Sequence, residues 1–241
     1  MRYTTLSLLF VIVLSNQLFA QDSLQKKHLA FKIAPLAILD IDNTFQFAIE
    51  HRLKGNRWTL SEELGYGTSA GNFWTALDGS TESRFRENIR AKLEARKYRN
   101  GSAFNGRYVA YELLFKQIND KAQRSIGREC ESGMCNYYEI VNYPINKYVV
   151  GISAKIGYQI RIRNELKKST NFVFDFYVGA GLRRIMINHH DPNENLQGSI
   201  NMYTDHYYGD GLFSNSGLGY RDRNYNIPHL SLGLKLGYLI F

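Results

Sequence analysis

Apolar and polar residues alternate strictly along the last stretch of the chain, residues 228–241. On an extended strand one face would carry Leu230, Leu232, Leu234, Leu236, Tyr238 and Ile240. The other face would carry His229, Ser231, Gly233, Lys235 and Gly237. A soluble β-sandwich can contain such a strand. A last strand that ends on Phe241 is more typical of an outer-membrane barrel, in which the apolar face meets lipid and the polar face lines the lumen.

The same period of two recurs in seven earlier segments. The predicted strands are 28–36, 44–52, 58–66, 87–97, 108–116, 148–160 and 172–182, followed by 228–241. Most have the roughly 9 to 11 residues that a tilted membrane-spanning strand requires. Helix propensity would favour a helix over 87–97. In a helix, however, Ile89, Leu93 and Arg96 would form a mixed stripe, so the alternation favours a strand.

The connections between the predicted strands alternate in length. Those after the second, fourth and sixth strands are short, whereas those after the third, fifth and seventh are long and polar. Outer-membrane barrels show this asymmetry, and a soluble Greek-key sandwich has no reason to show it. The pattern therefore predicts an all-β fold, an eight-stranded antiparallel up-and-down transmembrane β-barrel with short periplasmic turns and long extracellular loops.

The amino-terminal residues resemble a secretory signal. Arg2 supplies a positive charge, residues 6–14 are apolar, and Ala20 is a small residue before the expected cut. We expect residues 1–20 to be a signal peptide and residues 21–241 to form the barrel domain. After Ala20 no apolar stretch approaches the roughly 18 residues of a transmembrane helix, so the mature chain is either secreted and soluble or a barrel.

The composition agrees with a strand-rich exported protein. Tyr (17) and Phe (14) are abundant and Pro (4) is scarce, as strands favour. The formal net charge is +8, but no nucleic-acid recognition motif accompanies it and nucleic acid is a poor partner for an exported chain. Anionic lipid headgroups are the more natural partner of this charge, and a solvated loop surface is the simpler alternative.

Charged residues of both signs are expected on the inward faces of the strands. They are Lys32, Glu50, Glu63, Arg90, Lys92, Glu94, Arg96, Glu112, Lys155, Asp175, Arg183 and Lys235. The lumen of an eight-stranded barrel is about filled by its own side chains, and buried charges must pair. We therefore predict a lumen plugged by an ionic network. A catalytic or proton-relay role for Glu112 or Asp175 is the less favoured alternative.

Two other groups of residues are candidates for reactive sites. His189, His190 and Asp191 could form a metal site with His206 in the same connection, but neighbouring residues on a strand point to opposite faces. Some barrels are lipid-modifying enzymes with a lipid-facing Ser and His. Here Ser231 and His229 share the inward face, and no orienting acid accompanies them in a recognisable motif. We predict no catalytic residue, no bound metal and no cofactor.

The long connections carry two further features. Cys130 and Cys135 are the only cysteines, and the oxidising compartment of an exported chain favours a local disulfide between them. The connection 188–227 is rich in tyrosine, including Tyr203, Tyr207 and Tyr220. Tyrosine among adaptable polar residues is typical of binding loops, so a surface ligand or glycan could bind there. Tyrosines that pack on one another above the barrel mouth are the favoured alternative.

The chain resembles the small outer-membrane barrels of Bacteroidota, including the DUF3575 family of unknown function. The residues that carry the resemblance are the signal peptide, 45–52, 178–181 and 233–238. It implies insertion by the barrel assembly machinery, which reads the last strand, with Tyr238 and Phe241 as the assembly signal. Such endings often carry an aromatic two residues before the final Phe, where this chain has Leu239.

Together these observations predict a monomeric barrel in the cell outer membrane, in contact with outer-membrane lipid. We expect a structural or surface-interaction role carried by the extracellular loops, and no enzymatic activity. The alternatives are an outer-leaflet lipid-modifying enzyme and a small passive pore, which the strand count disfavours.

Overall fold

The fold is that of a computed structural model. It describes residues 29–40, 43–53, 57–68, 86–99, 103–131, 134–162, 171–190, 201–202 and 223–240. Within these ranges no helix is long and apolar enough to cross a membrane. The predicted signal peptide, residues 54–56 and Phe241 lie outside the described residues.

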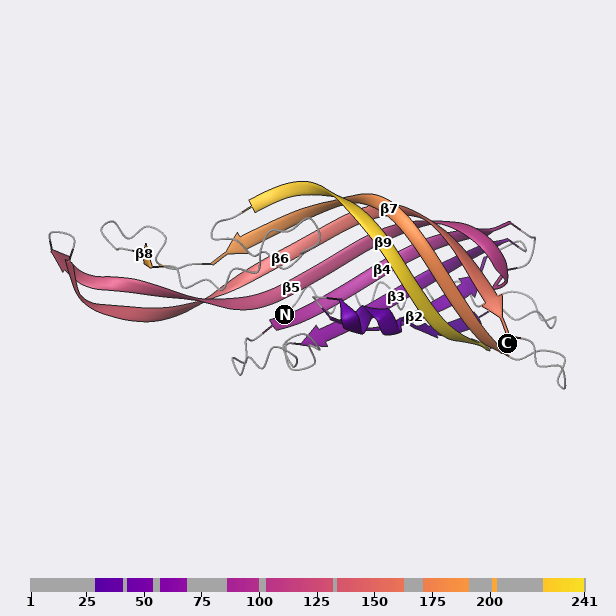
Figure 1. The fold of residues 1–241 in the computed structure, drawn as a ribbon, viewed down its shortest axis with the longest axis horizontal. Coiled ribbons are helices and arrows are strands. Elements are labelled where there is room, and N and C mark those ends of the chain that lie inside the picture. Colours follow the sequence, from indigo (N-terminus) through magenta and orange to yellow (C-terminus); the bar gives the residue numbers. More distant parts are fainter. Residues whose placement is uncertain are drawn as a thin grey trace.

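The chain forms one antiparallel β-sheet of nine strands whose hydrogen bonds ring through eight of them (Figure 1). The ring strands are β1 (Leu29–Ile33), β2 (Phe45–Arg52), β3 (Trp58–Thr68), β4 (Arg86–Tyr98), β5 (Gly106–Glu131), β6 (Met134–Arg161), β7 (Phe172–His189) and β9 (Arg223–Ile240). Each pairs with the next, and β9 pairs with β1 to close the ring. The short β8 (Asn201–Met202) pairs with β5 at Ser125 and Ile126.

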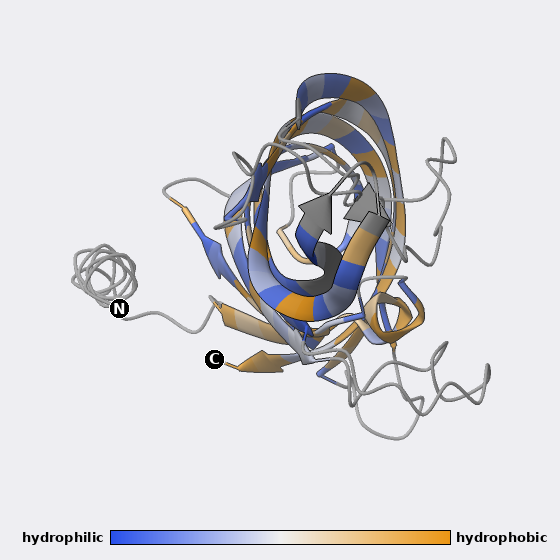
Figure 2. Ribbon diagram, turned by 90° about the vertical axis from the view of Figure 1, so that its left-hand side faces the viewer, coloured by the Kyte–Doolittle hydropathy of each residue, from blue (hydrophilic) through white to orange (hydrophobic). Residues whose placement is uncertain are grey.

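Each predicted strand coincides for most of its length with a strand of this ring, including β4, for which a helix was the alternative. Burial alternates along them with a period of two, as in β2, where every second side chain is exposed. Figure 2 looks along the ring and shows the matching bands of polar and apolar residues. Because Leu29 pairs with Ile240, the start of β1 and the end of β9 lie together. We call this the terminal end of the ring.

The prediction of a long polar loop between 116 and 148 is wrong. Residues 117–131 continue β5 and residues 134–147 belong to β6, and the two form a long hairpin that projects from the opposite end, which we call the hairpin end (Figure 1). The polarity of the segment suggested a loop. A strand, however, needs only a backbone partner in register, and residues such as Tyr137, Tyr138 and Ile140 favour the strand conformation.

The first predicted strand is shorter than expected and the last two are longer. β1 ends at Ile33, and Pro35–Leu39 form the 3₁₀ helix η1. Proline at the start of a helix has the required φ and lacks only an N–H that would have no partner there. β7 continues to His189, and β9 already begins at Arg223. The predicted connection 188–227 is therefore partly strand.

Two apolar clusters lie inside the ring at different heights. One, near the terminal end, contains Ala30, Tyr98, Ala103, Phe104, Tyr108, Ala110, Val173 and Leu239. The other, towards the hairpin end, contains Tyr143, Ile145, Val149, Ile185 and Ile187, with Tyr225 and Ile227 packed against it. The inward face thus changes from polar to apolar along β6, β7 and β9, which the sequence analysis did not predict.

Candidate functional site: the charged interior and the cavity beside β9

Between the two apolar clusters the interior of the ring is ionic. Ten of the twelve predicted inward charges form it: Lys32, Glu50, Glu63, Lys92, Glu94, Arg96, Glu112, Lys155, Asp175 and Lys235. Every ring strand contributes at least one of them. Five are basic and five are acidic, so the formal charges balance within this ionic network.

The part of the network nearer the terminal end joins four side chains that are fully buried. The Lys32 ammonium lies 2.5 Å from a Glu50 oxygen and 2.8 Å from an Asp175 oxygen. The Arg96 guanidinium lies 2.6 Å from Asp175 and 3.2 Å from Glu50. Each carboxylate therefore contacts two cations. Such mutual pairing offsets the several kcal/mol that each buried charge costs in desolvation.

Tyrosine hydroxyls complete the coordination of these carboxylates. The Tyr98 hydroxyl donates to Glu50 at 2.8 Å, and the Tyr108 hydroxyl donates to Asp175 at 2.5 Å. The Arg96 guanidinium also lies over the Tyr108 ring, 4.6 Å from its centroid. Tyr98 was not among the predicted site residues. Continuing the period of two by one step beyond Arg96 would have placed it on the inward face.

The part of the network nearer the hairpin end is organised by Glu63. Its carboxylate lies 2.5 Å from Lys92 and 2.5 Å from Lys235. Lys155 pairs with Glu112 and lies over the Tyr177 ring, 4.2 Å from the centroid.

Glu94 connects the two parts of the network. One of its oxygens lies 2.6 Å from Arg96, and the other lies 3.5 Å from Lys155 and 3.6 Å from Lys235. The interior is therefore one continuous ionic network.

Inward-facing glycines make room for the two large aromatic rings of the network. A Cβ at Gly157 would lie 2.2 Å from Cζ of Tyr108, and a Cβ at Gly233 would lie 2.2 Å from Cζ of Tyr177. Any side chain at either glycine would displace the ring beside it. The glycines that interrupt the inward faces of β6 and β9 are thus part of the packing.

The other two predicted charges lie nearer the hairpin end, beside a cavity. Arg90 pairs with Asp40 at 2.6 Å, and Nη2 of Arg183 lies 2.7 Å from Nε2 of His229. The cavity has a volume of about 510 Å³ and is lined by both of these pairs. It also touches η1 and runs along β9 from Ile227 to Leu234. Ser231, which was weighed with His229 as a reactive pair, lines it as well.

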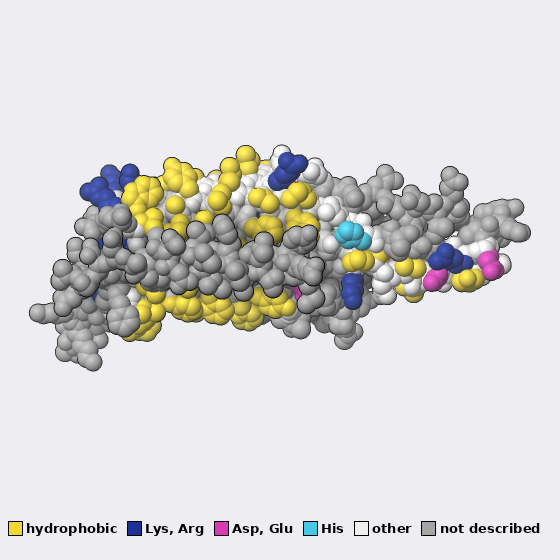
Figure 3. Space-filling view, turned by 180° about the vertical axis from the view of Figure 1, so that it is seen from behind, with side chains coloured by type: hydrophobic (Ala, Val, Ile, Leu, Met, Phe, Trp, Pro, Cys, Tyr) yellow, Lys and Arg dark blue, Asp and Glu magenta, His cyan; other side chains and the backbone are white. Residues whose placement is uncertain are grey.

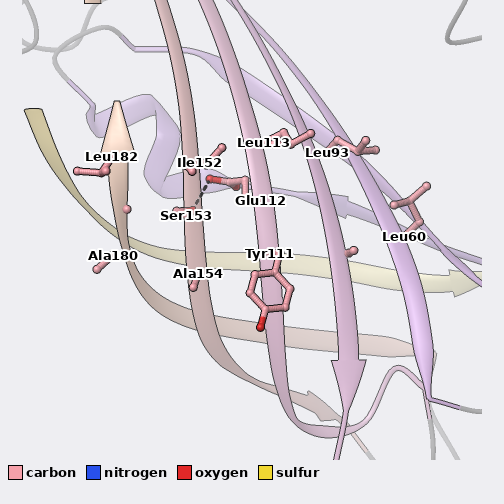
Figure 4. Close-up of a pocket in the computed structure, with 12 residues that line it drawn as sticks. Leu60, Leu93, Tyr111, Glu112, Leu113, Ile152, Ser153, Ala154, Ala180 and Leu182 are labelled. Atoms are coloured by element: carbon pink, nitrogen blue, oxygen red, sulfur yellow. Dashed lines mark hydrogen bonds between the residues drawn. The ribbon is translucent and has the colours of Figure 1, made fainter. Parts of the chain in front are cut away.

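A second cavity, of about 590 Å³, is a hollow on the outside of the ring (Figure 4). Leu60, Leu93, Leu113, Ile152 and Leu182 surround it, and the small residues Ala95, Ala154 and Ala180 leave the space. The strands beneath it turn polar side chains inward, where the Ser153 hydroxyl donates to Glu112 at 3.3 Å (Figure 4). The hollow is mostly apolar, although Glu112 and Ser153 of the strands beneath also line it.

The remaining predicted site residues lie apart from the network. Cys135 is disulfide-bonded, and Cys130 is its register partner near the tip of the hairpin. The Tyr238 ring packs edge-on against Phe172 at the terminal end.

Of the residues considered as an alternative metal site, His189 and His190 are described, whereas Asp191 and His206 lie outside the described ranges, as do Tyr203, Tyr207 and Tyr220 of the tyrosine-rich connection. Within those ranges no group of three His, Cys, Asp or Glu side chains could hold a metal ion.

No family model, no curated protein and no solved structure matches the chain. The resemblance to the Bacteroidota barrels therefore stays a prediction.

Proposed function

We propose that the chain is an outer-membrane β-barrel protein whose lumen is closed and whose role is structural or interaction-based. The observation that carries this proposal is the inversion of polarity across the ring. Side chains such as Leu232 (78% exposed) and Ile156 (65% exposed) face outward, while Lys32, Glu50 and Asp175 are fully buried inside.

This inversion supports a membrane location because water would penalise it. Soluble proteins rarely expose contiguous apolar patches larger than a few hundred Å². In the space-filling view, hydrophobic side chains gather over the body of the ring, and Lys and Arg lie towards its ends (Figure 3). A hydrocarbon environment would instead favour such a surface. Where neighbouring strands pair around the ring, they also satisfy backbone groups that lipid cannot satisfy.

The balanced ionic network supports a closed lumen. Its ten charges contact one another from all eight ring strands, with apolar clusters on both sides. An ion crossing the ring would have to separate these pairs. Structural support and surface recognition therefore fit the interior better than passive transport.

The β5–β6 hairpin supports a role in surface interaction. Near its tip Tyr137, Tyr138 and Ile140 are 52%, 51% and 68% exposed. Exposed aromatic residues on a projecting element are typical of recognition surfaces. In the proposed orientation, with the terminal end in the periplasm, this hairpin projects from the cell. The barrel would be monomeric and inserted by the assembly machinery.

Membrane fractionation together with gel migration tests the proposal. We expect the full chain in the outer-membrane fraction, with faster migration in an unheated detergent gel than after boiling, because a folded barrel stays compact. The proposal would be contradicted by a soluble periplasmic protein whose gel migration is the same with and without boiling.

A further inference from the structure

The ring is closed along only part of β9. β7 pairs with β9 from Arg223 to Tyr238, whereas β1 pairs with it only from Leu236 to Ile240. Among the described strands none pairs with the second edge of β9 between Arg223 and Lys235. The 3₁₀ helix η1 lies beside this edge, where β1 would otherwise continue.

Pro228 lies within this unpaired stretch. Proline has no N–H for a sheet hydrogen bond, so in sheets it is confined to edges, first residues and bulges. Its place in β9, with Leu182 of β7 as its register partner, agrees with a strand that has a neighbour on one side only.

The cavity beside η1 passes around this edge. Eight consecutive residues of β9, Ile227 to Leu234, line it. Neighbouring residues on a strand point to opposite faces, so the cavity touches both the inside and the outside of the ring. On the inside lie His229 and Ser231, and on the outside lie Leu230 and Leu232, which are 75% and 78% exposed.

The two sides of this passage differ in chemistry. The interior side is lined by the basic side chains Arg90, Lys92, Lys116, Lys155 and Arg183 and by the acidic side chains Asp40 and Glu112. Arg90 pairs with Asp40, and Lys92 and Lys155 belong to the balanced ionic network. The outer side is formed by leucines of β9 and by Leu36 of η1. A ligand that fills both must join an anionic group to a hydrocarbon chain.

We propose that this lateral opening binds an anionic single-chain amphiphile. Its carboxylate or phosphate head enters the ring beside Arg183, and its acyl chain leaves along the leucines of β9. The inference rests on the proposed membrane location, which would bring such ligands to the opening. The volume of about 510 Å³ lies within the range of small-molecule sites.

Arg183 is the residue best placed to hold the head. The contact of its Nη2 with Nε2 of His229, at 2.7 Å, orients the guanidinium at the cavity wall. Guanidinium groups bind carboxylates and phosphates through two parallel hydrogen bonds. Arg184, the next residue, is exposed on the opposite face and donates to Asn224 at 2.9 Å. It therefore provides a matched control.

Displacement of a fluorescent fatty acid from the detergent-purified full chain tests the proposal. We expect palmitate or lysophosphatidate to compete, and monoacylglycerol and inorganic phosphate to compete at least tenfold more weakly. Arg183→Gln should weaken binding about tenfold or more, since a hydrogen bond to a charged group is lost. Arg184→Gln should change it less than twofold. Equal competition by monoacylglycerol, or by inorganic phosphate, would overturn the proposal.

Photolabelling locates the chain of the bound ligand. A fatty acid with a photoreactive group in its chain should label peptides that contain Leu36 and residues 230–234, and Arg183→Gln should reduce that labelling. Labelling spread evenly over the outer face would overturn the site. Each variant is first checked for heat-dependent migration. A chain that migrates as a barrel but shows no saturable binding contradicts this inference alone, whereas a soluble chain contradicts the proposed function.

Discussion

Two adjacent glutamates on β3 have opposite environments. Glu63 is buried and contacts Lys92 and Lys235, both at 2.5 Å. Glu62 points to the other face, is only partly buried, and has Leu93 as its register partner on β4. The difference follows from the alternation of side chains along a strand, which puts one carboxylate into the network and leaves the other outside it.

The two positions make a matched pair for measuring what the network contributes. Glu63→Gln would leave two buried ammonium groups without their shared carboxylate, so we expect a loss of about 3 kcal/mol in the free energy of unfolding. Glu62→Gln should not destabilise the protein, because it removes a charge from the outward face. Urea unfolding of the protein in detergent micelles or lipid vesicles measures both. Equal effects at the two positions would mean that the network adds little to stability.

At the scale of the elements, the β5–β6 hairpin differs from the ring that carries it. β4 pairs with β5 only as far as Asp120, opposite Arg86. Beyond that point β5 has β6 as its long partner and β8 at two residues. A two-stranded ribbon is marginally stable in water. The disulfide near its tip is therefore a local reinforcement.

Removal of the disulfide should loosen the tip and leave the ring unchanged. The ring closed by Cys130 and Cys135 is small, so the chain-entropy model gives a stabilisation of about 2 kcal/mol. In Cys130→Ser/Cys135→Ser we expect faster amide exchange in residues 121–143. Residues 148–160, which lie in the ring portion of β6, are the internal control, and their amide exchange should not change. Faster exchange in both segments would show that the hairpin and the ring unfold together.

At the scale of the whole molecule, the interior is layered. An apolar cluster closes the terminal end, the ionic network fills the middle, and a second apolar cluster lies towards the hairpin end. The cavity beside η1 opens from the middle layer sideways along β9. In this arrangement the cavity gives a route to the interior through the wall of the ring.

The layering predicts a barrel that does not conduct. In planar lipid bilayers the purified protein should give no steady current at about 100 mV, because the paired charges leave no continuous water path. The protein used has gel migration that depends on heating, which shows that it is folded. An absence of current then cannot be due to unfolded protein. Stable current steps that scale with salt concentration would contradict the closed lumen and favour a pore.

The alternation of residues along the chain was enough to predict eight strand segments and the direction of their side chains. A period of two depends only on neighbouring residues, so Lys32, Glu50 and Asp175 could be placed inside before any strand was paired. The same local rule failed for 117–147, where polar residues form strands because a partner strand satisfies their backbone. The polarity of a segment does not show whether its backbone pairs with another strand.

Only the tertiary structure decided which charges meet. Lys32 and Asp175, 143 positions apart in the sequence, come together because β1 and β7 flank β9 in the ring. It also decided that β1 stops at Ile33 and leaves an edge of β9 beside η1. The cavity at that edge combines side chains from several strands and one 3₁₀ helix. The chemistry of the cavity depends on distances between residues of different elements. The alternation of residues along one strand gives no information about those distances.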